Sequence, residues 1–198
     1  MAPNIPVATL NDGNKIPLIG YGTWCQSFEA GPKLKPSMKY IIEQGGRHFD
    51  GATLYCNEKE IAEAVRESGI PRQEFFITTK VWITDLHKAR ESLEGSLQRT
   101  GLDYFDLLLV HWPQTTFEGT AENPDDPSLR NYLKVWREFE TFPATGKVKS
   151  IGELLSASWM LEIGSFDLCL GHREVDLSTL ELSNLPDSPK MLCYLYNC

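Results

Sequence analysis

The chain has 198 residues, of which 41% are hydrophobic and 23% charged, values typical of a globular domain with one hydrophobic core. Its apolar runs fall short of the roughly 20 residues that a membrane-spanning helix needs, and its N-terminus does not resemble a signal peptide, so we expect a cytoplasmic protein. The net charge of −8 disfavours nucleic acids and anionic membranes as partners. Five cysteines without a CxxC pair argue against a zinc site and a disulfide framework.

The sequence predicts a short β-hairpin at the N-terminus, followed by alternating strands and helices. Residues 7–10 and 15–17 read as extended segments around a turn that contains Gly13. Further apolar runs of strand-like composition are expected to form five β-strands. These runs cover residues 18–23, 47–50, 75–81, 105–110 and 147–152.

Helical periodicity fills three of the intervals between these strands. The expected helices cover residues 57–69, 84–101 and about 128–142. Asn57 and Glu60 are spaced as a capping box for the first helix, and Thr84 can cap the second. Repeated βα units with almost continuously apolar strands predict an α/β fold with a parallel sheet, either doubly wound or closed into a barrel.

The βα rhythm ends at Gly152. Residues 153–198 hold seven acidic and two basic side chains and yield no further regular pattern. We therefore divide the chain into residues 1–152, which carry the repeated units, and a divergent tail over residues 153–198.

Polar side chains follow the predicted strands at their downstream ends. Thr23, Asp50, Lys80 and His111 each lie there, and Tyr55 follows Asp50 closely. In a barrel these positions converge on the rim where barrel enzymes keep their active sites. Lys80 is expected to pair with Asp50, and its cation to lower the pKa of Tyr55 from about 10 so that the phenol becomes a usable acid. His111 is expected to donate a hydrogen bond to the same oxygen.

Three tryptophans accompany this set of polar residues. Trp24 follows Thr23, Trp82 lies two residues beyond Lys80, and Trp112 follows His111. An aromatic wall with a few convergent polar groups is typical of a small-molecule site.

Five blocks within residues 7–152 resemble successive blocks of the aldo-keto reductase family. In order, they are Gly22-Thr23-Trp24, His48-Phe49-Asp50-Gly51-Ala52-Thr53-Leu54-Tyr55-Cys56-Asn57-Glu58, Thr79-Lys80-Val81-Trp82, Leu109-Val110-His111-Trp112-Pro113 and Gly146-Lys147-Val148-Lys149-Ser150-Ile151-Gly152. The resemblance implies a parallel (β/α) barrel of the TIM type that reduces an aldehyde or ketone to an alcohol with NADPH.

The resemblance also implies roles for individual residues. Tyr55 matches the proton donor, Lys80 and Asp50 its partners, and His111 the residue that orients the substrate carbonyl. Gly22, Thr23, Trp24 and Asp50 match cofactor-binding positions. Trp24, Trp82, His111 and Trp112 match substrate-binding positions. No residue matches a metal ligand.

After Gly152 the chain departs from the family pattern. Glu153-Leu154-Leu155 stands where the family has a small residue and then Ser-Asn, which hold the nicotinamide carboxamide. The later aromatic that stacks on the nicotinamide and the basic stretch that binds the 2′-phosphate are not found. Because a complete barrel needs about 250 residues, we expect an incomplete barrel of about five βα units, from a truncated or mis-spliced product or a faulty gene model.

Two alternatives to the reductase follow from this departure. A non-catalytic remnant, or a protein that self-associates through the open edge of its sheet, needs no cofactor. A cofactor-free acid/base enzyme, such as an isomerase, would use Tyr55 and His111. The sequence leaves the oligomeric state open.

Overall fold

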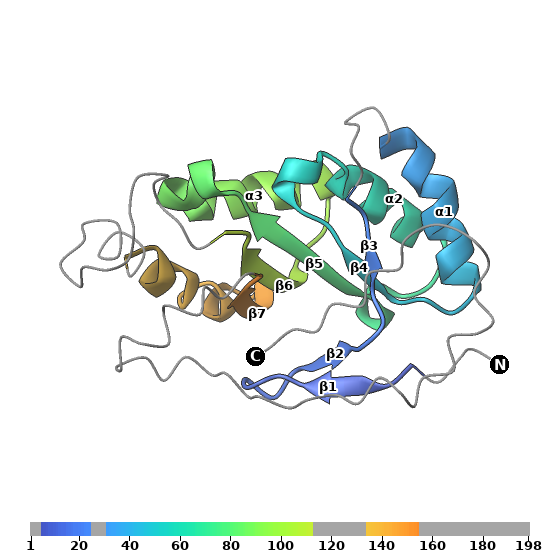
Figure 1. Cartoon of the computed structure of the whole chain (residues 1–198), viewed down its shortest axis with the longest axis horizontal. Coiled ribbons are helices and arrows are strands. Elements are labelled where there is room, and N and C mark those ends of the chain that lie inside the picture. The colour runs from blue at the N-terminus through green and yellow to red at the C-terminus, as the bar shows by residue number, and fades with distance from the viewer. Residues whose placement is uncertain (1–4, 25–30, 113–133, 155–198) are drawn as a thin grey trace.

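The computed structural model describes residues 5–24, 31–112 and 134–154 (Figure 1). The elements are β1 (Val7–Thr9), β2 (Lys15–Pro17), β3 (Tyr21–Gly22), α1 (Gly31–Glu43), β4 (His48–Asp50), η2 (Thr53–Tyr55), α2 (Glu58–Glu67), η3 (Arg72–Glu74), β5 (Phe76–Val81), η4 (Ile83–Lys88), α3 (Ala89–Thr100), β6 (Phe105–Val110), η5 (Pro143–Thr145) and β7 (Val148–Glu153). The elements labelled η are 3₁₀ helices, and residues 134–139 are also helical.

The five-stranded sheet is parallel throughout and has the order β3-β4-β5-β6-β7. Helices α1, α2 and α3 lie side by side along it (Figure 1). This arrangement confirms the predicted α/β fold with about five βα units. Within the described residues the sheet does not close into a barrel.

The N-terminal hairpin is confirmed. Strands β1 and β2 pair antiparallel, and Gly13 provides a left-handed backbone, φ 86°, in the turn between them. Leu10 and Ile16 of the hairpin belong to a small apolar cluster with side chains of β5 and β6. The hairpin therefore packs against the sheet rather than extending it.

Each central strand has two buried faces. All six residues of β5 and all six of β6 are buried, which explains why these strands lack polar alternation in the sequence. The larger core lies where the helices meet the sheet. Its members include Phe49, Ile77, Val81, Phe105, Leu108, Val110, Met38, Ile61, Leu93 and Phe139.

Helix α1 was not anticipated by the sequence patterns. Its segment contains Pro36, a residue that normally interrupts a helix, and has little net hydrophobicity. Met38 and Ile42 are nevertheless buried one turn apart in the main core. Tertiary packing of this narrow stripe stabilises a helix that local propensity does not favour.

The start of the helix expected at Thr84 is wrong, whereas its end is confirmed. Residues 83–88 form a 3₁₀ helix, and Lys88 is the residue that precedes α3. Gly101, with φ 66°, ends α3 and donates its backbone N–H to the Leu97 carbonyl. The predicted helix over 128–142 agrees with helical residues 134–139, and its first part lies outside the described residues.

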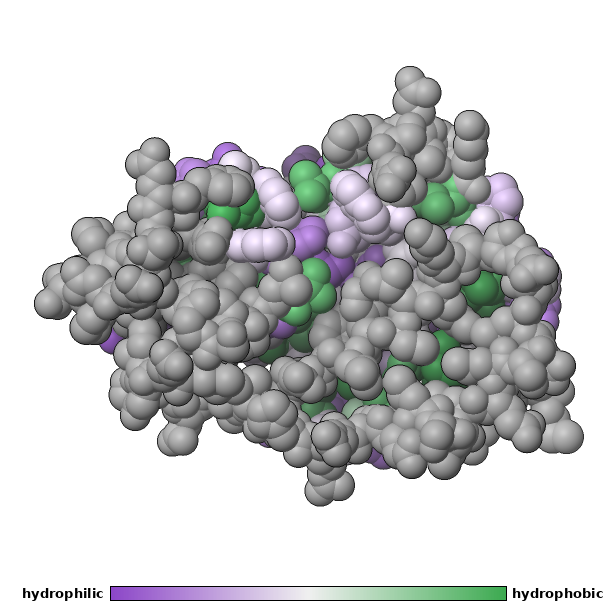
Figure 2. All heavy atoms as spheres, viewed as in Figure 1, coloured by the Kyte–Doolittle hydropathy of each residue, from purple (hydrophilic) through white to green (hydrophobic). Residues whose placement is uncertain are grey.

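The predicted tail begins inside a strand, because β7 continues to Glu153. Residues 155–198 lie outside the described part of the chain. Among the described helices, none has the length and apolar character needed to cross a bilayer. On the face shown in Figure 2, the described hydrophilic and hydrophobic side chains lie next to one another rather than in separate regions.

Candidate active site

The carboxyl ends of neighbouring strands bring the predicted site residues together. Gly22 of β3 is in register with Asp50 of β4, and Lys80 of β5 is in register with Leu109 of β6, two residues before His111. Because all these strands are parallel, their carboxyl ends share one edge of the sheet. The predicted residues therefore lie at one edge of the sheet, which does not close into a barrel rim within the described residues.

Asp50 and Lys80 form a buried ion pair at the centre of this edge. Both side chains are 0% exposed, and the Lys80 ammonium donates hydrogen bonds to Asp50 Oδ1 and, at 2.8 Å, to the Gly51 carbonyl. Burial lowers the pKa of Lys80, and the Asp50 carboxylate opposes that shift. The structure therefore contains the Asp50–Lys80 ion pair that the sequence predicted.

Tyr55 lies directly above this ion pair. Its hydroxyl oxygen is 3.4 Å from Lys80 Nζ and 3.4 Å from His111 Nε2. The residue ends η2, and the next residue, Cys56, adopts a left-handed backbone with φ 53°. This turn directs the chain into α2 and leaves the phenol facing both partners.

The expected lowering of the Tyr55 pKa is wrong. Burial raises the pKa of Tyr55, and the nearby Asp50 carboxylate raises it further. A phenolate here would lose hydration and face a second negative charge, while the Lys80 cation is already engaged by Asp50. Tyr55 therefore keeps its proton throughout the neutral pH range.

His111 completes the polar cluster. Its ring meets Tyr55 at 5.4 Å and Trp82 at 4.9 Å, edge to face in both cases. Burial lowers the pKa of His111 to about 4, and the positive charge of Lys80 acts in the same direction. The imidazole is therefore neutral near pH 7, and with the proton on Nε2 it can donate to an oxygen beside Tyr55.

Thr23 and Asn57 connect the end of β3 to the site. Thr23 donates its backbone N–H to the Asp50 carbonyl at 3.0 Å, and its hydroxyl donates to the same oxygen at 2.9 Å. Asn57 Nδ2 donates to the Thr23 carbonyl at 2.7 Å. Asn57 precedes α2 but makes no capping hydrogen bond, so the predicted capping box with Glu60 is wrong. Its amide serves this cross-connection instead, which no spacing in the sequence indicated.

Aromatic side chains border the polar cluster. The Trp24 ring lies 4.9 Å from the Tyr55 ring and is half exposed, and the Trp82 ring packs on His111. Trp112 follows His111 and is 43% exposed. These positions agree with the predicted apolar wall beside Tyr55 and His111.

The same edge of the sheet also carries groups that could bind a nicotinamide nucleotide. Asp50 Oδ2 is a buried acceptor without a hydrogen-bond partner among the described residues, and it suits a hydroxyl donor such as a ribose. Gly22, Thr23 and Trp24 lie at this end of β3. Within the described ranges, no group of three or more His, Cys, Asp or Glu side chains is placed to hold a metal ion.

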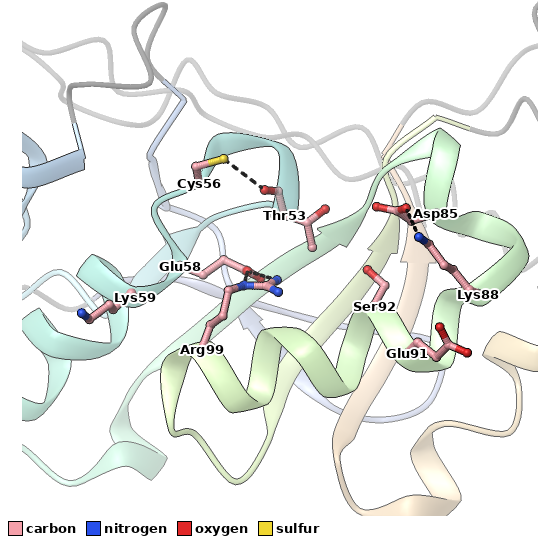
Figure 3. Close-up of a pocket in the computed structure, with 9 residues that line it drawn as sticks. All are labelled: Thr53, Cys56, Glu58, Lys59, Asp85, Lys88, Glu91, Ser92 and Arg99. Carbon is pink, nitrogen blue, oxygen red and sulfur yellow. Dashed lines mark hydrogen bonds and ion pairs between the residues drawn. The ribbon is translucent and has the colours of Figure 1, made fainter.

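A hollow of about 590 Å³ lies on the helical side between η2, α2, η4 and α3 (Figure 3). The residues that line it include Cys56, Lys59, Asp85 and Arg99. Asp50, Tyr55, Lys80 and His111 are not part of it. The exposed thiol of Cys56 is free, and the other four cysteines lie outside the described residues.

Comparison with known proteins agrees with this geometry. Glycerol 2-dehydrogenase (NADP(+)) of Saccharomyces cerevisiae is 36% identical over 160 residues, which cover 74% of this chain and 50% of the relative. Methylglyoxal reductase DkgA of Yersinia pestis is 36% identical over 147 residues, or 74% of this chain and 48% of the relative. The chain thus spans about half the length of the curated relatives it matches.

A solved structure shows the same partial correspondence. An aldo-keto reductase of the silkworm, Bombyx mori, complexed with NADPH, superimposes with a TM-score of 0.67 at 37% identity and covers 80% of this chain and 50% of its own. The sequence profile of the Aldo/keto reductase family matches residues 18–182. The chain therefore belongs to the aldo/keto reductase family.

Proposed function

We propose that this chain carries the catalytic side chains of an NADPH-dependent reductase that converts an aldehyde or ketone to an alcohol. One observation supports this most strongly: the Tyr55 hydroxyl lies 3.4 Å from both Lys80 Nζ and His111 Nε2. A protonated phenol between a cation and a neutral imidazole is suited to give a proton to a developing alkoxide.

The raised pKa of Tyr55 is compatible with this role. An alkoxide is a much stronger base than a phenolate, so proton transfer from Tyr55 to the product oxygen remains favourable. Lys80 Nζ, 3.4 Å from the Tyr55 oxygen, then offsets part of the cost of the phenolate that forms, although Asp50 remains its main partner. His111 would donate from Nε2 to the carbonyl oxygen of the substrate and so fix that oxygen near the phenol.

The hydride has to come from a bound NADPH. Thr23, Trp24 and Asp50 would hold the nicotinamide end, with Asp50 Oδ2 accepting from a hydroxyl group. In support, a structural neighbour is complexed with NADPH and a sequence relative is named for NADP(+). A basic stretch to bind the 2′-phosphate is not found in the sequence after Gly152, so the proposal concerns only the nicotinamide end of the cofactor.

The substrate would be a small carbonyl compound with an apolar portion. Trp24, Trp82 and Trp112 supply aromatic surface beside the polar cluster. The relatives include a reductase named for methylglyoxal, a small carbonyl compound. We therefore expect short-chain and aromatic aldehydes to be the productive class.

The test is carbonyl-dependent oxidation of NADPH by the purified full chain, combined with fluorescence titration of NADPH. Binding together with turnover that Tyr55→Phe abolishes would support the proposal. Absence of NADPH binding in a self-associating chain would favour the non-catalytic alternative. Deuterium exchange from solvent into a carbonyl compound without NADPH would instead indicate the acid/base enzyme.

A further inference from the structure

The segment that carries Tyr55 is held by side-chain hydrogen bonds at both of its ends. At its start, the Thr53 hydroxyl donates to the Lys80 carbonyl at 3.0 Å. At its end, Asn57 binds the Thr23 carbonyl, and Glu58 Oε1 accepts from the Thr79 hydroxyl at 2.6 Å. Two of these contacts converge on consecutive residues of β5, the strand that supplies the Lys80 ammonium.

Thr79 and Lys80 point to opposite faces of β5, because successive residues of a strand alternate. Lys80 reaches Asp50 and Tyr55, while Thr79 reaches Glu58 in the first turn of α2. Glu58 thus attaches the start of α2 to the face of β5 that carries Thr79. The next residue, Lys80, lies on the opposite face and contacts Asp50 and Tyr55. Tyr55 is three residues before Glu58, so this attachment limits how far the phenol can move away from Lys80.

Glu58 differs from an ordinary acidic residue of a first helical turn. Its side chain is 5% exposed, and its second oxygen accepts from Arg99 Nη2 at 2.7 Å (Figure 3). Arg99 comes from α3 and is itself fixed by a 2.9 Å bond to Ser96. A favourable interaction with the helix dipole alone does not require burial or partners on two other elements. Glu60, in the same turn, has no hydrogen bond to β5 among the described residues.

We propose that Glu58 is a positioning residue that, through Thr79 on β5 and Arg99 on α3, holds the Tyr55 hydroxyl within reach of Lys80 and His111. The inference rests on the proposed function for its kinetic consequence only. The structural claim is that Glu58 fixes the position of the Tyr55 phenol, and this claim does not depend on cofactor or substrate. Glu58 acts through the backbone and does not touch the reacting atoms.

The experiment compares variants of the full chain by NMR of ¹³Cζ-labelled tyrosine, with the Tyr55 signal assigned by its loss in Tyr55→Phe. Thr79→Val removes the donor to Glu58 at nearly constant volume, and Thr79→Ser retains it. Thr100→Val is the matched control, because among the described residues the buried Thr100 hydroxyl bonds only within and just after α3. Glu58→Gln and Glu60→Gln form a second pair with equal loss of charge.

In Thr79→Val we expect the Tyr55 signal to move and broaden, and its titration to begin at lower pH as the phenol gains water. Glu58→Gln should give an intermediate change, since its amide oxygen can accept from Thr79 while its NH₂ group faces Arg99. Thr79→Ser should restore the native signal, and Thr100→Val and Glu60→Gln should leave it unchanged. Where NADPH oxidation is measurable, kcat should fall about tenfold in Thr79→Val with little change in KM, since small displacements of reacting groups reduce the rate strongly.

A Tyr55 signal that is unchanged in Thr79→Val, while the unfolding midpoint falls as much as in Thr100→Val, would overturn the proposal. If Thr79→Val does not fold, Glu58→Gln is compared with Glu60→Gln instead. A Tyr55 signal that is unchanged in both variants would overturn the proposal. The NMR measurement needs no NADPH. A chain that neither binds nor oxidises NADPH, but whose Tyr55 signal responds to Thr79→Val, would refute the proposed function and leave the positioning role standing.

Discussion

Tyr55 and His111 meet edge to face, with the Tyr55 hydroxyl 3.4 Å from His111 Nε2. Burial acts on both rings so that each is neutral near pH 7: it raises the pKa of Tyr55 and lowers that of His111 to about 4. The cluster therefore contains two uncharged hydrogen-bonding groups above one ion pair, and its behaviour with pH follows from this.

The first prediction concerns stability at acid pH. Unfolding lets His111 return to its ordinary pKa of about 6.5, so the unfolded chain binds more protons and His111 destabilises the fold as pH falls from about 6.5 to about 4. Between pH 7 and pH 5 the wild type should lose about 2 kcal/mol more unfolding free energy than His111→Asn.

Urea unfolding at the two pH values measures this difference. His48, whose pKa burial also lowers, contributes equally to both proteins and so cancels. Equal losses in the wild type and His111→Asn would contradict the burial of His111.

The second prediction concerns the proton donor. Tyr55→Phe removes the hydroxyl and keeps the ring that contacts Trp24 and His111. We expect kcat to fall by about 10² to 10⁴ with the Kd for NADPH unchanged, because general-acid catalysis is lost while the binding groups remain. Steady-state kinetics and fluorescence titration measure the two quantities, and retention of more than a tenth of the activity would assign the proton to another group.

The third prediction concerns the buried ion pair. Asp50→Asn leaves the Lys80 ammonium without its carboxylate, and Lys80→Met leaves Asp50 without its cation. Each single change should lower the free energy of unfolding by about 3–5 kcal/mol, because an uncompensated buried charge remains. The double variant should lose less than the sum of the two. An additive result in urea unfolding would mean that the two groups do not interact.

The fourth prediction concerns the aromatic wall. Trp82→Ala removes the ring that packs against His111 at 4.9 Å. We expect a higher KM for aromatic aldehydes, by about tenfold, with a smaller change for short aliphatic ones, because stacked aromatic contacts contribute about 0.5–1.5 kcal/mol beyond burial. Kinetics with benzaldehyde and propanal compare the two classes, and an equal change for both would place Trp82 away from the substrate.

The strands and the main polar cluster could be predicted because both depend on local pattern. Phe105–Val110 is continuously apolar and is buried on both faces, and residues just beyond such strands must share one edge of a parallel sheet. Asp50, Lys80 and His111 were found in this way. The family resemblance added their roles, which the pattern alone does not specify.

Other features depend on contacts between distant residues and could not be predicted from the sequence. The 2.7 Å bond from Asn57 to the Thr23 carbonyl spans 34 positions in the chain, whereas the expected cap was a local interaction. The predicted direction of the shift in the Tyr55 pKa was wrong. The sequence shows which charged residues are present, but it does not show how far burial removes water from the phenol. Helix α1 is likewise stabilised by packing, against its own composition.

The left-handed backbone at Cys56 has a consequence for the way the proton donor is placed. Cys56 is the only non-glycine with positive φ in the described ranges, and such a conformation costs a residue with a β-carbon roughly 1–2 kcal/mol. An isolated peptide of residues 53–58 would therefore not favour this turn. The location of the phenol is therefore a property of the assembled sheet, and a sequence change as far away as β3 or α3 can alter the acid without touching it.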